Sequence, residues 1–374
     1  MKILILAQTP PPFHGQAIMQ KYLVDAKWDW CVKKHIRLKY SSEINEVGKF
    51  KLSKIFELVK IVFKVWKERI KGEIDLISYP PSGPNRIPFY RDVATLLLIR
   101  WTTKKIIFHF HAGGINNLLE KLSPIENMLA KMSLQKPDAS IVLLDSLKKE
   151  ISWFKSKCVY VVPNGIPDIP KKFIVREDHS LINILTVGLI SEEKGIFTIL
   201  ETAKELQEKY IKFRWKLIGE FVSNEIERQC MDLVYEFHIE EAVEFVGKMT
   251  GDEKWKYFIN TDIFISLSQS TEAFPLVFLE AMMFTLPVVA TNWRGIPEII
   301  EEGKNGYLVP VKSPEITAEK LMLLIKNKNL RSTFGLTNRK KYLDSFTVNS
   351  HVKKIEKLFQ QLIFNDDFLK INNV

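Results

Sequence analysis

Residues 262–300 read DIFISLSQSTEAFPLVFLEAMMFTLPVVATNWRGIPEII and alternate apolar runs with loop-forming residues. DIFISLS at 262–268 is rich in strand-forming residues, and LPVVAT at 286–291 predicts a second strand. Between them, Pro275 suits the first turn of a helix, because that turn does not need its missing N–H. Gly295 then opens a turn before a further short helix at IPEII. This order predicts a parallel α/β sheet whose ligand binds at the carboxyl ends of its strands.

Two glutamates, Glu272 and Glu280, lie eight positions apart in this stretch, one in the expected loop and one in the helix. The amides of Ala273, Phe274 and Leu276 lack helical partners there and can cradle an anion. Acidic residues also gather at helix N-termini because the helix dipole favours them, so surface decoration is the alternative. The surrounding alternation favours a site for a nucleotide-activated sugar, in which carboxylates hold hydroxyls and amides hold phosphate.

Two series of strands and helices are expected along the chain. In the first, strands at 3–7, 75–79, 105–110, 139–145 and 158–165 alternate with helices near 16–26, 48–72, 90–102 and 117–135. In the second, strands at 183–188, 215–220, 243–247, 262–268 and 286–291 alternate with helices near 195–210 and 224–237. The proline-containing linker 163–180 separates the two series. We therefore expect an α/β protein with two Rossmann-like domains.

The composition excludes several classes of protein. The chain has 374 residues, of which 46% are hydrophobic and 26% charged, as is typical of a globular protein of two domains. The opening MKILILA is too short for a signal peptide, and no apolar run reaches about eighteen residues, so no membrane-spanning helix is expected. Cys31, Cys158 and Cys230 are few and distant, which favours reduced thiols in the cytoplasm and neither disulfides nor a metal cluster.

The net charge of +10 is unevenly distributed. Residues 1–165 hold 27 Lys and Arg against 14 Asp and Glu, so the remainder is slightly acidic. Within this basic part, GKFKLSKIFELVKIVFKVWKERIKG at 48–72 places lysines around a broad apolar helix face. A core-packed helix with a solvated charged face explains part of this pattern, and contact with an anionic membrane is equally consistent with it. Nucleic acid is disfavoured because no recognisable binding module or stacking platform is present.

The stretch 262–310, including GIPEII and GKNGYLVP at 303–310, resembles the donor-binding region of retaining glycosyltransferases of the GT-B fold, family 4. The hallmark of that family is a Glu, seven residues and a second Glu. The resemblance implies two facing Rossmann-like domains with a cleft between them: an acceptor-side domain at 1–165 and a nucleotide-sugar domain at 166–346. It also implies a last helix, near 347–364 within 347–374, that crosses back to the first domain.

The resemblance also implies an activity. The expected reaction transfers a sugar from a nucleoside diphosphate sugar to a glycan or lipid-linked acceptor and retains the anomeric configuration. The expected setting is the assembly of bacterial surface polysaccharide such as lipopolysaccharide. Glu280 is expected to bind the nucleotide ribose. The sugar hydroxyls and the phosphate are expected to be bound by Glu272 and residues 273–276, including Pro275. The stretch VGLISEEKG at 187–195 resembles the family's phosphate loop, with Gly188 near its start, and Lys194 in it is expected to stabilise the diphosphate. Leu189 stands where the family most often has an arginine.

Further positions match the family's motifs in part. The loop TPPPFHGQA at 9–17 resembles its glycine-rich N-terminal loop, with Gly15 retained and His14 in place of a second glycine. In HFHAGG at 109–114, His111 aligns best with the family's active-site histidine, and His109 is the alternative. Arg91, beside Asp92, is a candidate for holding an acceptor phosphate, with an exposed helix-start pair as the simpler reading. Four positions at strand ends resemble the pocket for the nucleotide base: Gly219, Glu220, Val246 and Gly247.

Metal and cofactor chemistry is not expected. The sequence has no Asp-x-Asp pair, which disfavours the metal-dependent GT-A type, and no Gly-x-Gly-x-x-Gly after a strand, which disfavours a nicotinamide enzyme. Rival functions on the same fold are a nucleotide-sugar epimerase or a phosphorylase. A third is a membrane-associated partner subunit that lost its chemistry, which the missing arginine makes conceivable. The sequence does not specify the sugar, the nucleobase or the acceptor.

Overall fold

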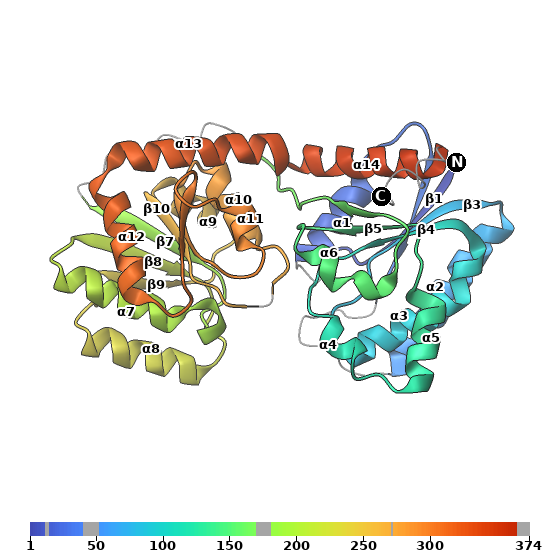
Figure 1. Ribbon diagram of the computed structural model, residues 1–374, viewed down its shortest axis with the longest axis horizontal. Helices are drawn as coiled ribbons and strands as arrows, with labels where there is room; N and C mark the ends of the chain where they lie inside the picture. The colour runs from blue at the N-terminus through green and yellow to red at the C-terminus, as the bar shows by residue number, and fades with distance from the viewer. Residues whose placement is uncertain (12–14, 40–51, 170–180, 271, 365–374) are drawn as a thin grey trace. The chain divides into compact units, whose positions relative to one another are not determined.

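The computed structural model describes residues 1–11, 15–39, 52–169, 181–270 and 272–364 (Figure 1). The chain forms two compact units. The first comprises Met1–Gly165, Glu272–Phe274 and Val348–Val374, and the second comprises Ile166–Thr271 and Pro275–Thr347. The main boundary thus falls between Gly165 and Ile166, within the proline-containing stretch at 163–180.

The first unit is built on a parallel sheet that has six strands among the described residues, in the order β2-β1-β3-β4-β5-β6. The strands are β1 (Lys2–Ala7), β2 (Val32–Arg37), β3 (Ile74–Tyr79), β4 (Thr103–His109), β5 (Ala139–Val142) and β6 (Val159–Val161). The side chains of β1 from Ile3 to Ala7 are fully buried, as expected where helices cover both faces of a parallel sheet. The strand order reverses between β1 and β3, so this is a flavodoxin-like order.

Helices cover the first sheet. They are α1 (Gly15–Asp25), α2 (Leu52–Ile70), α3 (Arg86–Ile99), α4 (Asn116–Leu119), α5 (Pro124–Leu134), α6 (Leu147–Glu150) and α14 (Val348–Phe364), with short 3-10 turns η2 (Arg100–Thr102) and η3 (Ser152–Phe154). Helix α3 packs against both α2 and α5, and α14 packs against α1 (Figure 1). Ile355 and Phe359 of α14 are fully buried in the same core as Ile5 and Ile107 of the sheet. The last described helix therefore completes the core of the first unit.

The second unit has a parallel sheet with the order β12-β11-β10-β7-β8-β9 in the described part of the chain. Its strands are β7 (Ile182–Val187), β8 (Phe213–Ile218), β9 (Val243–Gly247), β10 (Ile263–Ser266), β11 (Val288–Thr291) and β12 (Gly306–Val309). Counted within the unit, this is the Rossmann order, which reverses between β7 and β10. Ligands of such sheets bind outside the carboxyl ends of the strands at the reversal point.

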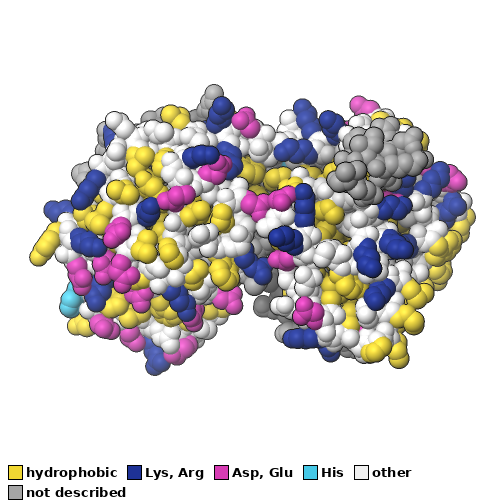
Figure 2. Space-filling model, viewed as in Figure 1, with side chains coloured by type: hydrophobic (Ala, Val, Ile, Leu, Met, Phe, Trp, Pro, Cys, Tyr) yellow, Lys and Arg dark blue, Asp and Glu magenta, His cyan; other side chains and the backbone are white. Residues whose placement is uncertain are grey.

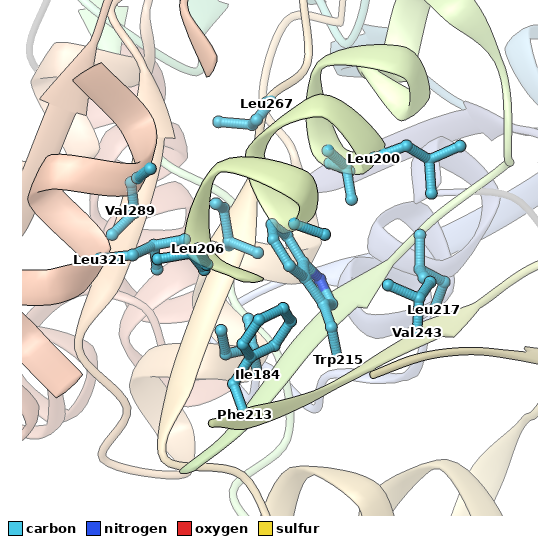
Figure 3. Packing of buried hydrophobic residues seen from close by; sticks show 14 of the residues in the cluster. Ile184, Leu200, Leu206, Phe213, Trp215, Leu217, Val243, Leu267, Val289 and Leu321 are labelled. Carbon is cyan, nitrogen blue, oxygen red and sulfur yellow. The ribbon is translucent and has the colours of Figure 1, made fainter. Parts of the chain in front are cut away.

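The core of the second unit is centred on Trp215, which is fully buried (Figure 3). Its indole N–H donates to the Thr186 hydroxyl at 3.1 Å, so burial leaves no unpaired donor. Ile184, Leu200 and Leu206 pack around it from β7 and the following helix. The helices here are α7 (Ile196–Glu208), α8 (Asn224–Glu236), α9 (Gly251–Ile259), α10 (Leu276–Met283), α11 (Ile296–Ile299), α12 (Pro314–Lys326) and α13 (Lys328–Ser345), with the 3-10 turn η5 (Glu192–Lys194).

Most expected elements are confirmed, with some corrected bounds. The helix expected from residue 90 begins at Arg86, because Pro88 is tolerated in a first turn whose N–H groups need no partner. The helix expected at 117–135 is two helices, since Ser123 caps a new one that starts at Pro124. The helix expected at 48–72 is described from Leu52 to Ile70, and 48–51 lie outside the described residues. Strands β2 and β12 were not expected.

Candidate active site

The loops after β7 and β10 lie next to each other at the reversal point of the second sheet, because these two strands pair directly. The Gln269 N–H donates to the Glu193 carbonyl oxygen at 2.9 Å, which links the two loops. Gly195 has φ +80, and a Cβ there would lie 2.4 Å from the Leu267 carbonyl oxygen. Only glycine allows this approach without a backbone shift. The loop that holds Lys194 is thereby fixed against the end of β10.

Lys194 points its ammonium toward the segment that follows β10. Its Nζ lies 3.4 Å from the Ser270 hydroxyl oxygen, and its side chain is half-buried. The Ser270 carbonyl oxygen accepts a hydrogen bond from Trp293 Nε1 at 3.1 Å, so the loop after β11 meets the same segment. Leu189, in the same loop as Lys194, is 55% exposed and supplies no charge. The loop after β7 therefore places a cation, Lys194, at this edge of the sheet.

Glu280 lies in α10 with only 13% of its side chain exposed. One of its oxygens, Oε1, accepts a hydrogen bond from Lys254 Nζ of α9 at 2.7 Å, and the Lys254 side chain is 17% exposed. Burial raises the pKa of Glu280, and the Lys254 ammonium opposes that rise. The other oxygen, Oε2, is buried and has no hydrogen-bond partner among the described residues. A buried acceptor of this kind is suited to a hydroxyl donor from a ligand.

The segment before α10 differs from expectation in one detail. Helix α10 begins at Leu276, and Pro275 precedes it as the N-cap with φ −71 and ψ 115. Pro275 is therefore not inside the first turn, although its fixed φ still leads the chain into the helix. Glu272 is exposed, whereas Ala273 and Phe274 are buried. Glu272 to Phe274 belong to the first unit and Glu280 to the second.

Three glycines line the carboxyl ends of the adjacent strands β7, β8 and β9. The Gly188 N–H donates to the Ile218 carbonyl oxygen and the Gly219 N–H to that of Gly247, each at 3.0 Å. A Cβ on Gly219 would lie 1.7 Å from the Gly188 carbonyl oxygen, so no larger residue fits. Gly219 therefore allows the ends of β7 and β8 to approach closely.

The neighbours of these glycines form the rest of the expected base pocket. Val246 is half-buried beside Gly247. Glu220 is exposed and pairs with Lys248, whose Nζ lies 3.1 Å from Glu220 Oε2. Both side chains are more than half exposed, so this ion pair contributes little to stability and can open for a ligand.

Histidines and a glutamine meet at the end of β4 in the first unit. The rings of His109 and His111 lie 4.0 Å apart between centroids. Gln20 Nε2 lies 2.8 Å from His111 Nε2 and 3.4 Å from His109 Nδ1, so one amide group contacts both rings. With the amide donating to both ring nitrogens, each imidazole is neutral and its proton sits on the other nitrogen. His109 is 1% exposed whereas His111 is half-buried, which makes His111 the better placed to reach a ligand.

His351 of α14 extends this cluster. Its ring centroid lies 5.9 Å from that of His109. Its Nδ1 lies 2.6 Å from the Pro163 carbonyl oxygen, which can only accept, so the proton is on Nδ1. Burial lowers the pKa of His351 to about 4 and that of His109 well below its usual value. His109 and His351 are therefore uncharged at pH 7.

The remaining sequence candidates have mixed outcomes. Gly15 is exposed at the start of α1, and His14 lies outside the described residues. Arg91 forms an ion pair with Asp92, with Nη2 at 2.9 Å from Oδ1. Asp92 is 2% exposed and also accepts from the Tyr79 hydroxyl at 2.7 Å, so the exposed helix-start pair expected here is wrong. The pair lies inside α3 because that helix starts at Arg86.

Sequence reasoning missed several residues of these sites. Lys254 has no spacing relation to Glu280, because α9 reaches it only through the tertiary fold. Ser270 and Trp293 are joined in the same way across two loops. Gln20 had a weak signal, since it is a polar residue on the buried face of α1 beside Ala17 and Leu23. Among the described residues, no three His, Cys, Asp or Glu side chains gather as a metal site requires.

Comparisons with known proteins relate the chain to glycosyltransferases. The family described as glycosyl transferases group 1 matches residues 169–341. MJ1178 of Methanocaldococcus jannaschii, named an uncharacterized glycosyltransferase, is 25% identical over 371 residues, which are 97% of this chain and 99% of that protein. WcaL of Escherichia coli (strain K12), provisionally named a colanic acid biosynthesis glycosyltransferase, is 30% identical over 145 residues. These are 37% of this chain and 35% of WcaL, so the match spans about a third of that relative.

The fold is shared with solved structures. A crystal structure of HepE from Anabaena in complex with UDP has a TM-score of 0.74 to this chain at 15% identity, and covers 96% of this chain and 100% of HepE. A likeness at that identity shows the fold alone. Residues 169–341 thus match the glycosyl transferase group 1 family, and the chain has the two-unit α/β fold of GT-B glycosyltransferases.

Proposed function

We propose that this protein is a retaining glycosyltransferase that moves a sugar from a nucleoside diphosphate sugar to a glycan or lipid-linked acceptor. The observation that supports this most is the arrangement at the reversal point of the second sheet. There the loop after β7 holds Lys194 against Ser270, and the helix that follows β10 holds Glu280 with one buried oxygen unsatisfied. These groups lie in the region that matches group 1 glycosyl transferases.

In this proposal, different groups of the site bind the ribose, the base and the diphosphate of the donor. The buried Oε2 of Glu280 accepts a ribose hydroxyl, and the strand-end glycines 188, 219 and 247 bring backbone against the base. Lys194 lies where the diphosphate binds. HepE was crystallised with UDP, which supports a nucleoside diphosphate as the ligand class.

The reaction breaks the bond between the anomeric carbon and the diphosphate. Negative charge accumulates on the leaving phosphate, so a cation already in place lowers the barrier more than one that must move there. Lys194 supplies that charge in our proposal, without a metal ion. In the same proposal His111 orients the sugar and Glu272 binds its hydroxyls.

The setting we propose is the assembly of bacterial cell-surface polysaccharide, at the cytoplasmic face of the plasma membrane. The provisional name of WcaL supports such a pathway. No helix among the described residues is long and apolar enough to cross a bilayer. Contact with anionic lipid is instead proposed for α2, through Lys60, Lys64 and Lys67. Vesicle flotation of a variant with all three changed to Glu tests this contact, and unchanged binding contradicts it.

Incubation of the full chain with UDP-, GDP- and ADP-sugars tests the activity. We expect slow hydrolysis of at least one donor without an acceptor, because water can replace the acceptor nucleophile. Lys194→Ala should lower that rate by about a hundredfold, as removal of a charge-stabilising group typically does. Lys209→Ala is the matched control, since Lys209 is a surface residue of the same unit that pairs with Glu205. Turnover that survives Lys194→Ala and Glu280→Ala together contradicts the site, and no turnover or binding of any donor favours a non-catalytic subunit.

A further inference from the structure

The first unit exposes large apolar side chains on the helices that lie side by side as α2, α3 and α5. Phe56 and Phe63 of α2 are 68% and 60% exposed, and Trp101 of η2 is 67% exposed. On α5, three residues on neighbouring turns are exposed by more than half: Ile125, Met128 and Met132. We call these six residues the apolar ridge. Single exposed apolar residues are ordinary, but a series over adjacent helices marks an interaction surface.

Ring contacts link the α2 and η2 parts of the ridge, and a side-chain to backbone contact ties η2 to α5. Phe63 packs edge-on against Trp66 at 5.6 Å, and Trp66 lies 6.3 Å from Trp101. The next link is Arg100, which donates to the carbonyl oxygens of Ser133 and Lys136 at the end of α5. Met132 immediately precedes Ser133. The apolar side chains of α2 and η2 and those of α5 therefore belong to elements that are held together.

The two tryptophans of this surface need no hydrogen bond from water. Trp66 Nε1 and Trp101 Nε1 both donate to the Leu98 carbonyl oxygen, at 3.0 and 2.8 Å. Moving a polar N–H into an apolar medium is costly only when the group is left unpaired. The exposed indole of Trp101 can therefore enter the interfacial region of a bilayer with its N–H already satisfied, which is where tryptophan is enriched.

Basic residues surround the ridge. Lys60, Lys64 and Lys67 of α2 are exposed between its apolar positions, and Lys131 is exposed on α5. Lys60 pairs with Glu57 at 2.8 Å, a surface ion pair of little strength. In Figure 2, hydrophobic and Lys or Arg side chains are interleaved over the outer part of this unit. Long lysine side chains can lie along apolar surface and place their ammonium groups at lipid phosphates.

We propose that the apolar ridge inserts into an anionic lipid bilayer, with α5 and Trp101 contributing as well as α2. Charge decides against a second copy of this chain as the partner. A two-fold interface would bring the same surface of both copies together, so the lysines around the ridge would face lysines. An anionic lipid surface instead complements these charges. This proposal goes beyond the electrostatic contact of α2, because it has apolar side chains enter the bilayer. Vesicle binding is measured separately from sugar transfer, so the membrane proposal and the proposed activity can fail independently.

Flotation with vesicles of phosphatidylcholine, with or without phosphatidylglycerol, tests the proposal on the full chain. The decisive variant is Ile125→Gln/Met128→Gln/Met132→Gln, which changes no charge and keeps good helix formers on α5. We expect it to lower the partition onto phosphatidylglycerol vesicles by at least about tenfold, because three apolar side chains no longer leave water. Leu336→Gln/Leu343→Gln is the control, because both residues are exposed on α13 of the second unit. This control should bind as wild type does.

Quenching of tryptophan fluorescence by brominated lipid reports insertion directly. We expect vesicle binding to quench the wild-type protein, and Trp101→Phe to lose a large part of that quenching while it still floats. Wild-type binding by the α5 variant would restrict the contact to α2 and overturn the proposal. Absence of binding to any vesicle would also overturn it, as would a stable dimer in light scattering that the α5 variant abolishes.

Discussion

Burial raises the pKa of the Glu280 carboxyl, and the Lys254 ammonium, which donates to Oε1, opposes that rise. Because its pKa is raised, the Glu280 carboxylate takes up its proton at a higher pH than an ordinary glutamate does. Only the ionised form offers Oε2 as a strong acceptor to a ribose hydroxyl. Lys254 is therefore a positioning residue for the donor site in our account.

Replacement of Lys254 tests this role. In Lys254→Met the pKa of Glu280 should rise further, because burial then acts without the opposing charge. We expect the donor KM to increase about tenfold near pH 7 and more at lower pH, since a charged hydrogen bond of this kind contributes about 1.5 kcal/mol or more. Lys256→Met, on the exposed side of the same helix, is the control. Equal KM values and equal pH profiles for the two variants would contradict the role.

Gln20 holds two imidazoles through a single amide, and it is 1% exposed. Gln20→Leu keeps the approximate size and removes the donor, so His111 loses the group that sets its orientation and tautomer. We predict a fall in kcat of about tenfold or more, with little change in donor KM, because orientation acts in the transition state. Steady-state kinetics with an active donor measures this split. A change confined to KM, or to the melting temperature, would mean that Gln20 has only a binding or structural role.

At the scale of elements, the close approach of the carboxyl ends of β7 and β8 depends on Gly219. A Cβ at this position would overlap the Gly188 carbonyl oxygen at 1.7 Å. We expect Gly219→Ala to lower the free energy of unfolding of the second unit by about 2 kcal/mol or more, because backbone must shift. Gly72→Ala is a matched control, since Gly72 has a similar φ of +150 with nothing within 4 Å of its Cβ. If chemical denaturation showed the same loss of unfolding free energy for Gly219→Ala and Gly72→Ala, the backbone angle φ alone would explain the effect.

Helix α14 is attached to the first unit through a buried neutral histidine. The pKa of His351 is lowered to about 4 by burial, against about 6.5 in an unfolded chain. The unfolded state therefore binds a proton in a pH range where the folded state does not. Stability of the first unit should be complete above about pH 6.5 and fall as the pH drops toward 4, by about 3 kcal/mol from this residue.

Denaturation of the first unit at several pH values measures this loss. His351→Gln keeps a donor for the Pro163 carbonyl oxygen and cannot titrate, so its stability should fall less steeply below pH 6.5. The slope that remains in the variant belongs to other groups, among them His109, whose pKa is lowered in the same direction. Parallel profiles for wild type and variant would show that His351 is protonated equally in both states.

These elements also show what the sequence can predict. The apolar run of β1 identifies a doubly covered strand, and its burial confirms that reading. Strand β2 was missed because VKKHIR alternates charged residues with few buried ones, as an edge strand can. The strand-loop-helix order around Glu280 and Lys194 was visible, since local propensity and tertiary fold agree there. The Lys254 and Gln20 contacts were not, because they join residues far apart in sequence.

The whole molecule combines two parallel sheets of different strand order, each with a core of its own. The second has the Rossmann order and places Lys194 and Ser270 at its reversal point. The first has a flavodoxin-like order and takes its last helix from the end of the described chain. In our account the second unit binds the nucleotide, and the first carries the lipid-facing surface.

The most direct test of this account is calorimetric titration of the full chain with UDP, GDP and ADP. We predict that at least one nucleotide binds wild type, that Lys194→Ala and Glu280→Gln each weaken it about tenfold or more, and that Lys209→Ala binds as wild type does. Glu280→Gln is informative because it keeps the shape and removes the charge. A nucleotide that binds wild type and both site variants with one Kd would contradict the central claim that this edge of the second sheet is the donor site.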